Sequence, residues 1–365
     1  MVSETSSAQR EVSRRRRAMN LRQASTLLVA LSFYAFPLGS AKADDGQRPF
    51  YQGKKMQIVV GFAAGGGYDA YARLVARRMA KHIPGEPIIL VQNMPGAGSR
   101  VAANWLYSLA AKDGTVLGSV VQSTPLDQVF KEPGVQYDAR RFNWIGNPIV
   151  DNLVSITTAQ SGLVTLEDVK AKGGLICGSS GAGPTVAYPN AIGKLLQADT
   201  RIVSGYPGVS DITLAMQRGE VNCNGGQAWS SAKATMGQLL QDKKFLVLVQ
   251  WGTEADPDIS AVAGHDIPLV TDYARNDAER GALRLLASTS ALSRPLLAPP
   301  DVTADRVATL RKAFDRTMQD SDFLADAKKS SMDIRPEGGA EIQRLVESIV
   351  NTPADQIALA VHLTR

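Results

Sequence analysis

The chain has 365 residues and a formal net charge of +5. This excess lies at the start: residues 1–43 hold seven of the 40 Lys/Arg and two of the 35 Asp/Glu, which leaves 33 of each in the rest of the chain. A balanced chain carries no electrostatic signal for nucleic acid or for an anionic membrane. We therefore expect no nucleic-acid partner.

Residues 1–43 have the three parts of an export signal. A basic stretch, Ser13–Gln23, precedes an apolar stretch, Ala24–Phe36, and the small residues Ala41 and Ala43 follow. The apolar stretch is shorter than the roughly 20 residues that span a bilayer, which argues against the alternative of an N-terminal membrane anchor. We predict cleavage after Ala43 and a periplasmic mature protein, exported by the general or the twin-arginine route.

The roughly 320 residues that follow are enough for two ordinary hydrophobic cores. No later stretch approaches the 18 consecutive apolar residues of a membrane-spanning helix, so we expect the mature protein to be soluble.

Short apolar strands alternate with amphipathic helices in the first part of the chain. Strands are predicted at 56–62, 88–93 and 115–121, with helices at 69–83 and 99–110 between them. This order predicts a parallel sheet with helices on both faces.

A second alternating set begins after residue 150, and the chain after about Asp301 is mostly helical. The pattern predicts an α/β protein with two lobes, each a mostly parallel sheet flanked by helices. We assign 44–150 plus 251–365 to the first lobe and 151–250 to the second. The first crossing is expected near Pro148–Asn152, and the return crossing between Gln250 and Ala291.

The glycine-rich loop within Phe62–Ile83 raises the question of a dinucleotide, since Gly65, Gly67 and Ala70 match G-x-G-x-x-A. Three observations oppose it. The acid Asp69 would repel a pyrophosphate, the next strand ends without the expected acid, and an exported protein has no ready supply of nicotinamide cofactor. We therefore expect no cofactor.

The loops 63–69, 94–99 and 178–185 each place glycines and hydroxyls just before a predicted helix. Free N–H groups at helix N-termini favour anions, so a small carboxylate can be held there without Arg or Lys. Asp69 is expected to be the N-cap of its helix.

Signals for catalysis are weak. Gly178–Ala182 is one residue from G-x-S-x-G, and Ser230–Lys233 matches S-x-x-K without the partner motifs of the enzymes that use it. None of the three histidines has the spacing of a metal site. We assign no catalytic residue and no metal, and keep a periplasmic hydrolase as the alternative.

Six stretches together resemble the extracytoplasmic solute receptors of tripartite tricarboxylate transporters, the Bug family. They are 58–79, 91–106, 110–118, 178–185, 205–221 and 298–314. The resemblance implies a two-lobed periplasmic binding protein of type II, a Venus flytrap, that is not an enzyme. It would close over a small organic carboxylate and dock on the large and small membrane subunits of a permease. We expect a monomer, and a receptor for a sensor kinase remains a further alternative.

In the family, ligand carboxylates are held by the first strand-to-helix loop and its counterpart in the second lobe, which correspond here to Ala63–Asp69 and Ser179–Thr185. The loop after strand 115–121 and the region around residue 226 are expected nearby. The candidate ligand-binding residues are Ala64, Gly65, Gly66, Gly67, Tyr68, Asp69, Ser123, Thr124, Ser179, Ser180, Gly181, Thr185, Gly226 and Gln227.

Tyr68 departs from the family pattern, because members usually carry Thr or Ser at this position. A ring there would stack on a ligand or cover it, which makes an aromatic carboxylate worth testing beside the aliphatic ones. The alternative is a ring packed on the outer surface of the first helix.

The only two cysteines, Cys177 and Cys223, end two predicted strands that neighbour each other in a doubly wound sheet. In an oxidising compartment they can form a disulfide, whose loop of about 47 residues would stabilise the fold by about 4 kcal/mol. The alternative is a pair of buried thiols.

Overall fold

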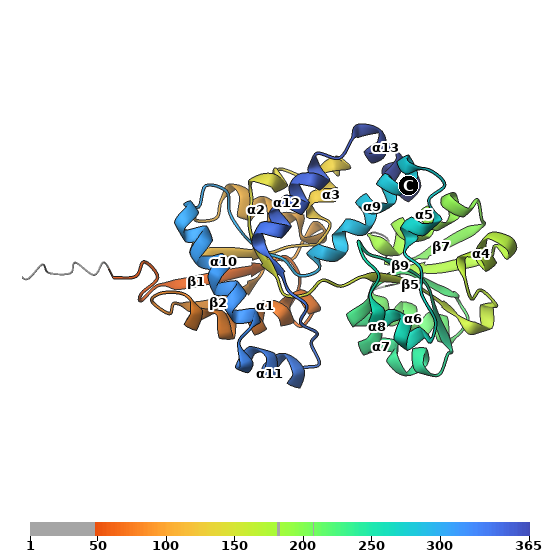
Figure 1. Cartoon of the computed structure of the whole chain (residues 1–365), viewed down its shortest axis with the longest axis horizontal. Coiled ribbons are helices and arrows are strands. Elements are labelled where there is room, and N and C mark those ends of the chain that lie inside the picture. The colour runs from red at the N-terminus through yellow and green to blue at the C-terminus, as the bar shows by residue number, and fades with distance from the viewer. Residues whose placement is uncertain (1–47, 181–182, 207) are drawn as a thin grey trace, which may run out of the picture. The chain divides into compact units, whose positions relative to one another are not determined.

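The computed structural model describes residues 48–180, 183–206 and 208–365, which form two β-sheets with helices around them (Figure 1). The predicted export signal, residues 1–43, lies outside the described residues. Within the described part of the chain, no helix is both long enough and apolar enough to cross a membrane.

The first sheet has six strands in the order β11-β4-β10-β3-β1-β2. β1 pairs in parallel with β2 and β3, while β10 runs antiparallel to both β3 and β4, and β11 antiparallel to β4. The bounds are β1 Lys55–Val60, β2 Ile88–Asn93, β3 Val116–Ser119, β4 Asn143–Asn147, β10 Leu296–Ala298 and β11 Glu337–Gly338.

The second sheet has five strands in the order β7-β6-β8-β5-β9. β6 pairs in parallel with β7 and β8, whereas β5 runs antiparallel to β8 and β9. The bounds are β5 Leu153–Thr158, β6 Leu175–Ser179, β7 Thr200–Ser204, β8 Cys223–Ala228 and β9 Phe245–Trp251.

The α/β fold with two helix-flanked sheets is confirmed, and both sheets contain parallel and antiparallel pairs. Each sheet takes up a strand just after the chain has crossed from the other sheet, and the first sheet also ends in the antiparallel strand β11. β5 follows the first crossing, β10 follows the return, and each runs antiparallel to its two neighbours. The residue boundaries of the two lobes stay a prediction.

Helices cover both faces of the first sheet because apolar side chains of β1 point to both sides of it. Met56, Ile58 and Val60 join the core with α1 and α10, and Val59 joins the core with α2 and α12. These helices are α1 Gly67–Met79, α2 Arg100–Ser108, α10 Ala304–Met318 and α12 Gly339–Val350.

The second sheet is covered in the same way. Val154 and Ile156 of β5 pack with α6 and α7, while Cys177 of β6 packs with α5 on the other face. The helices that follow the strands of this sheet are α4 Leu166–Lys172, α5 Pro184–Leu196, α6 Val209–Gln217, α7 Trp229–Gln241 and α8 Pro257–Ala263.

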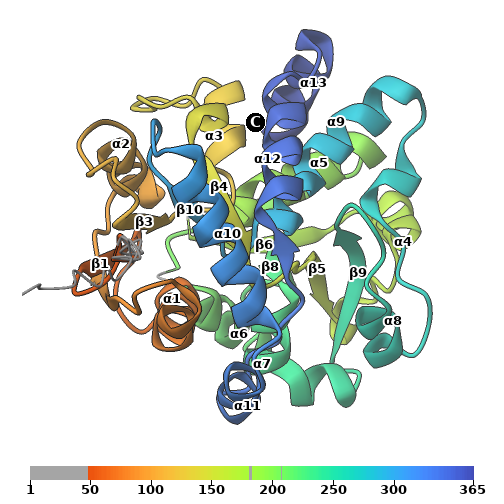
Figure 2. The ribbon, with the colours of Figure 1, turned by 60° about the vertical axis from the view of Figure 1, so that its left-hand side comes forward.

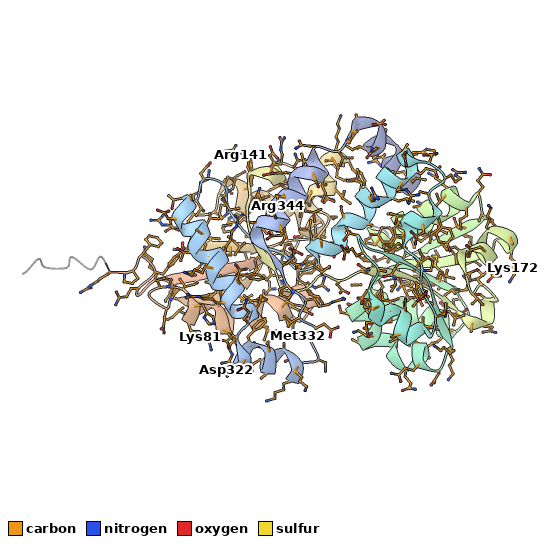
Figure 3. The ribbon with its side chains drawn as sticks, in the orientation of Figure 1. Lys81, Arg141, Lys172, Asp322, Met332 and Arg344 are labelled. Carbon is orange, nitrogen blue, oxygen red and sulfur yellow. A yellow bond between two sulfur atoms is a disulfide. The ribbon has the colours of Figure 1, made fainter. Side chains whose placement is uncertain are left out.

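The C-terminal helices connect the two sheets. α13 (Ala354–Thr364) packs against α5 and α9 (Asp277–Ala287), as Figure 2 shows, and Asn190 donates to the carbonyl oxygen of Thr364 at 3.0 Å. α11 (Ser321–Lys329) is held to α1 and the turn after it by ion pairs, including Lys81–Asp322 at 3.3 Å (Figure 3). The last helix therefore packs against α5, a helix that covers the second sheet.

Candidate functional site

The glycine loop leaves the carboxyl end of β1 and leads into α1. Residues 63–67 are exposed, and the N-cap of the helix is Gly66, which has no side chain to cap it. The first N–H groups of an α-helix have no acceptor within the helix. In α1 these N–H groups lie at an exposed stretch of backbone, at the positive end of the helix dipole.

Asp69 is the third residue of α1 and not its N-cap, so the N-cap prediction is wrong. Its carboxylate accepts from the Gly65 N–H at 2.9 Å, Arg73 Nε at 2.9 Å and Asn93 Nδ2 at 3.0 Å. The Arg73 guanidinium, helped by the Gly65 and Asn93 donors, holds the pKa of Asp69 well below its usual range. The buried carboxylate thus folds the loop back on the helix and leaves the following N–H groups uncapped.

Tyr68 points into the group of loops at the carboxyl ends of β1 and β3. Its ring stacks on Phe62 with 4.3 Å between ring centroids, and its hydroxyl accepts from the Gln122 N–H at 3.0 Å. The guanidinium carbon of Arg294 lies 4.7 Å from the ring centroid. Burial raises the pKa of Tyr68, against the opposing effect of Arg294. The alternative, a ring on the outer surface of α1, does not fit these contacts.

The bond between Tyr68 and Gln122 brings the next predicted residues beside the glycine loop. Ser123 is the half-buried N-cap of α3 (Thr124–Val129). Thr124 is fully buried, and its hydroxyl donates to the carbonyl oxygen of Val121 at 2.7 Å. Ser123 is therefore the more accessible hydroxyl of the two.

The second glycine-rich loop, 95–98, supports the first. A Cβ atom at Gly61 would lie 1.9 Å from Ser99 Oγ, so the buried Ser99 fits only against a glycine. Ser99 Oγ also accepts from the Val121 N–H at 3.2 Å. This loop thus packs behind the candidate site.

In the second sheet, the loop from β6 to α5 carries the corresponding hydroxyls. Ser179 Oγ and Thr185 Oγ1 are 3.0 Å apart and both residues are buried, while Ser180 is exposed. Gly181 lies outside the described residues. The N-cap of α5 is Gly183, again without a side-chain cap.

Gly226 and Gln227 lie in β8, beside this loop. A Cβ atom at Gly226 would lie 2.6 Å from Pro184 Cβ, so the glycine lets the start of α5 rest on the strand. The buried Gln227 accepts from Asn224 Nδ2 at 2.8 Å and donates to Thr235 Oγ1 at 3.1 Å. The structure therefore brings the second-sheet residues together, while their placement opposite the glycine loop across a ligand stays a prediction.

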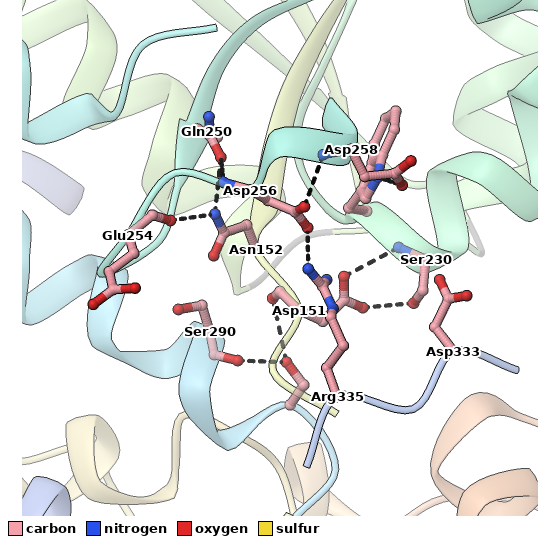
Figure 4. Close-up of polar contacts among 12 residues, drawn as sticks. Asp151, Asn152, Ser230, Gln250, Glu254, Asp256, Asp258, Ser290, Asp333 and Arg335 are labelled. Carbon is pink, nitrogen blue, oxygen red and sulfur yellow. Dashed lines mark hydrogen bonds and ion pairs between the residues drawn. The ribbon is translucent and has the colours of Figure 1, made fainter. Parts of the chain in front are cut away.

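Asp151, on the first crossing, is a buried acid that the sequence did not single out. Its carboxylate accepts from the N–H of Ser230 at 3.1 Å and from its hydroxyl at 2.5 Å (Figure 4). Burial raises the pKa of Asp151, although the Ser230 bonds and the charges of Arg294 and Arg335 oppose the shift. Asp151 thus links the start of α7 to the crossing segments.

The S-x-x-K pattern does not form a catalytic pair. The Ser230 hydroxyl donates to Asp151, whereas Lys233 Nζ pairs with Asp258 at 2.7 Å and Asp333 at 2.9 Å. Arg335 pairs with Asp256 at 2.5 Å, an ion pair drawn in Figure 4.

The histidines show no catalytic or metal-binding arrangement in the described part of the chain. His82 pairs with Asp320 at 2.9 Å, and His265 Nδ1 lies 3.3 Å from the carbonyl oxygen of Ala263. Among residues 48–180, 183–206 and 208–365, no three His, Cys, Asp or Glu side chains are grouped to hold a metal ion.

Cys177 and Cys223 are joined by a disulfide. They are direct partners in the parallel register of β6 and β8, with their Cα atoms 4.2 Å apart. The bond fixes the two strands from which Ser179 and Gly226 are presented.

Sequence reasoning missed Arg294, whose guanidinium lies against the start of α1. A Cβ atom at Gly67 would be 3.2 Å from Arg294 Nη2. The signal in the sequence is slight: Arg294 is the only charged residue between Leu285 and Pro300.

Comparison with known proteins supports this geometry at the level of the fold. No protein-family model and no curated protein match the chain. A TctC solute-binding protein from Polaromonas superposes with a TM-score of 0.63 at 14% identity, covering 86% of this chain and 98% of that one. MatC from Rhodopseudomonas palustris, solved with malate, gives 0.58 at 23% identity and covers 83% and 99%.

A second R. palustris protein, solved with adipate, gives a TM-score of 0.60 at 16% identity and covers 85% of this chain and 97% of that one. The chain therefore has the fold of these solute-binding proteins. The resemblance found in the sequence is confirmed in this respect.

Proposed function

We propose that this protein is a periplasmic receptor that captures a small organic carboxylate. It delivers the ligand to a permease of the tripartite tricarboxylate type, with a large and a small membrane subunit. The observation that carries the proposal is the exposed, uncapped N-terminus of α1 at residues 63–67.

A carboxylate suits this place for two reasons. Uncapped N–H groups and the helix dipole stabilise a negative charge, and the nearby acid, Asp69, is already bound by three donors. The exposed hydroxyl of Ser180 supplies a further hydrogen-bond donor. Two proteins of the same fold were solved with malate and with adipate, which are small carboxylates.

A periplasmic location is supported by two independent features. The first 43 residues have the pattern of an export signal. The disulfide between Cys177 and Cys223 belongs to an oxidising compartment.

Binding without turnover is supported by the partners of the candidate nucleophile. The Ser230 hydroxyl donates to a carboxylate and Lys233 is held by two others, so neither activates the other.

The proposal is tested by calorimetry on the mature protein with adipate, malate and benzoate, followed by NMR of the recovered ligand. We expect binding of at least one of them in a 1:1 ratio and its recovery unchanged. Consumption of the ligand, or no binding of any of the three, would contradict the proposal.

A further inference from the structure

Arg294 is a buried arginine with an unused donor. It lies between the 3₁₀ helix Ser288–Leu292 and β10, and only 8% of it is exposed. Its Nη1 donates to the carbonyl oxygen of Ser293 at 2.6 Å, but its buried Nε–H has no acceptor within the described chain. A buried donor on a charged group is costly to leave unpaired, so such a group indicates a missing partner.

The guanidinium is directed at the start of α1. A Cβ atom at Gly67 would lie 3.2 Å from Nη2 and 3.3 Å from Nε. The guanidinium carbon lies 4.7 Å from the ring centroid of Tyr68 and 5.8 Å from that of Tyr71. Two aromatic rings therefore hold the cation beside the uncapped N–H groups of the helix.

Two positive groups thus converge where one anion would satisfy both. The helix N-terminus carries a partial positive charge and Arg294 a full one. Asp69, the acid of the first turn, does not serve Arg294, because Gly65, Arg73 and Asn93 already bind it.

Asp151 is the alternative partner of Arg294. Its carboxylate is bound by Ser230 through two hydrogen bonds, and Arg294 attracts it only through a longer-range interaction. That attraction helps to hold the guanidinium when the site is free of ligand, but it leaves the Nε–H without an acceptor. The hydroxyl of Ser290, on the preceding 3₁₀ helix, is the other buried side-chain atom without a partner among the described residues.

We propose that Arg294 is the cationic partner of the bound carboxylate, with its Nε–H and the first N–H groups of α1 donating to the same carboxylate group. This inference rests on the proposed function and adds to it a charged recognition residue. It makes the site selective for an ionised carboxylate over the corresponding neutral amide, because the amide does not neutralise the guanidinium.

The test compares Arg294→Gln with wild type by calorimetry, using whichever of adipate, malate and benzoate the wild type binds, and the matching amide. Arg284→Gln is the control, since it removes the same charge from an exposed position on α9. We expect Arg294→Gln to weaken carboxylate binding by about tenfold to a hundredfold, and Arg284→Gln to leave it unchanged. The wild type should also bind the amide at least tenfold more weakly than the acid.

The outcomes separate the inference from the function. Equal carboxylate affinity in Arg294→Gln and wild type would overturn the role of Arg294 and leave the receptor proposal standing. Binding of none of the three carboxylates by the wild type would overturn both.

Thermal unfolding without ligand distinguishes a role in binding from a role in stability alone. In the second case, Arg294→Gln would lower the melting temperature and leave the affinity unchanged. If Arg294→Gln does not fold, Arg294→Lys keeps the charge but lacks the Nε donor. Unchanged affinity in that variant would also overturn the inference.

Discussion

Gly67→Ala perturbs the predicted site by a single methyl group. The new Cβ atom would lie 3.2 Å from Arg294 Nη2 and 3.3 Å from Nε, which is tighter than ordinary contact. The guanidinium must therefore move by a few tenths of an ångström from the start of α1. Gly237→Ala is the matched control, because it lies inside α7 with no atom within 4 Å of the new Cβ.

Gly67→Ala and Gly237→Ala should differ in ligand affinity but not greatly in stability. Alanine is favoured over glycine in a helix by up to about 1 kcal/mol, so Gly237→Ala should be at least as stable as wild type, and in Gly67→Ala this gain offsets part of the cost of the tight contact. A hydrogen bond to a charged group contributes about 1.5–3 kcal/mol, and losing half of it corresponds to about a threefold to tenfold loss of affinity. We expect that loss in Gly67→Ala and none in Gly237→Ala.

Urea unfolding followed by circular dichroism gives the free energy of unfolding, and calorimetry with the bound carboxylate gives the affinity. If Gly67→Ala binds the carboxylate as tightly as Gly237→Ala does, the inference that the Arg294 guanidinium takes part in binding is wrong. If Gly67→Ala instead lowers the free energy of unfolding by several kcal/mol, Gly67 is required for packing, and its effect on ligand affinity does not test the role of Arg294.

Three further variants test other parts of the site. Tyr68→Thr removes the ring that stacks on Phe62 and should shift the preference away from benzoate toward adipate, as measured by calorimetry. In Asp69→Asn, the free energy of unfolding should fall less steeply than in wild type as the pH drops below about 4. The lowered pKa of Asp69 means that its carboxylate stabilises the fold above its ordinary pKa, and wild type loses this stabilisation on acidification. Replacing Cys177 and Cys223 by Ser should cost about 4 kcal/mol for a sequence separation of 46, and the unreduced native protein should take up no alkylating reagent.

Each of these variants has a control. Tyr68→Phe keeps the ring and should keep the ligand preference, so an equal shift in both variants would contradict a role for the ring. Asp199→Asn changes an exposed acid and should leave the acid profile as in wild type. Two alkylated cysteines in the unreduced protein would contradict the disulfide.

The position of the glycine loop could be predicted because it depends only on residues that are close together in the sequence. A strand, three glycines and an amphipathic helix in succession place the loop at the carboxyl end of a strand, and it lies there. The role of Asp69 could not be predicted in the same way. Its partner Asn93 comes from the next strand, so the sequence suggested an ordinary N-cap where the structure has a three-donor contact.

The mixed sheets could not be predicted from periodicity. β10 has only three residues, too few to show an alternating pattern, and its antiparallel direction follows from the path of the chain after the return crossing. Arg294 was missed for a related reason. Its importance depends on a contact with Gly67, more than two hundred positions earlier in the chain.

The most direct test of the receptor proposal is native mass spectrometry of the protein purified from the periplasm without denaturation. We expect a species that carries one small organic acid, which is released unchanged on denaturation and can bind again to the refolded or ligand-stripped protein. A native protein with no added mass, which also gains none with millimolar adipate, malate or benzoate, would contradict the account.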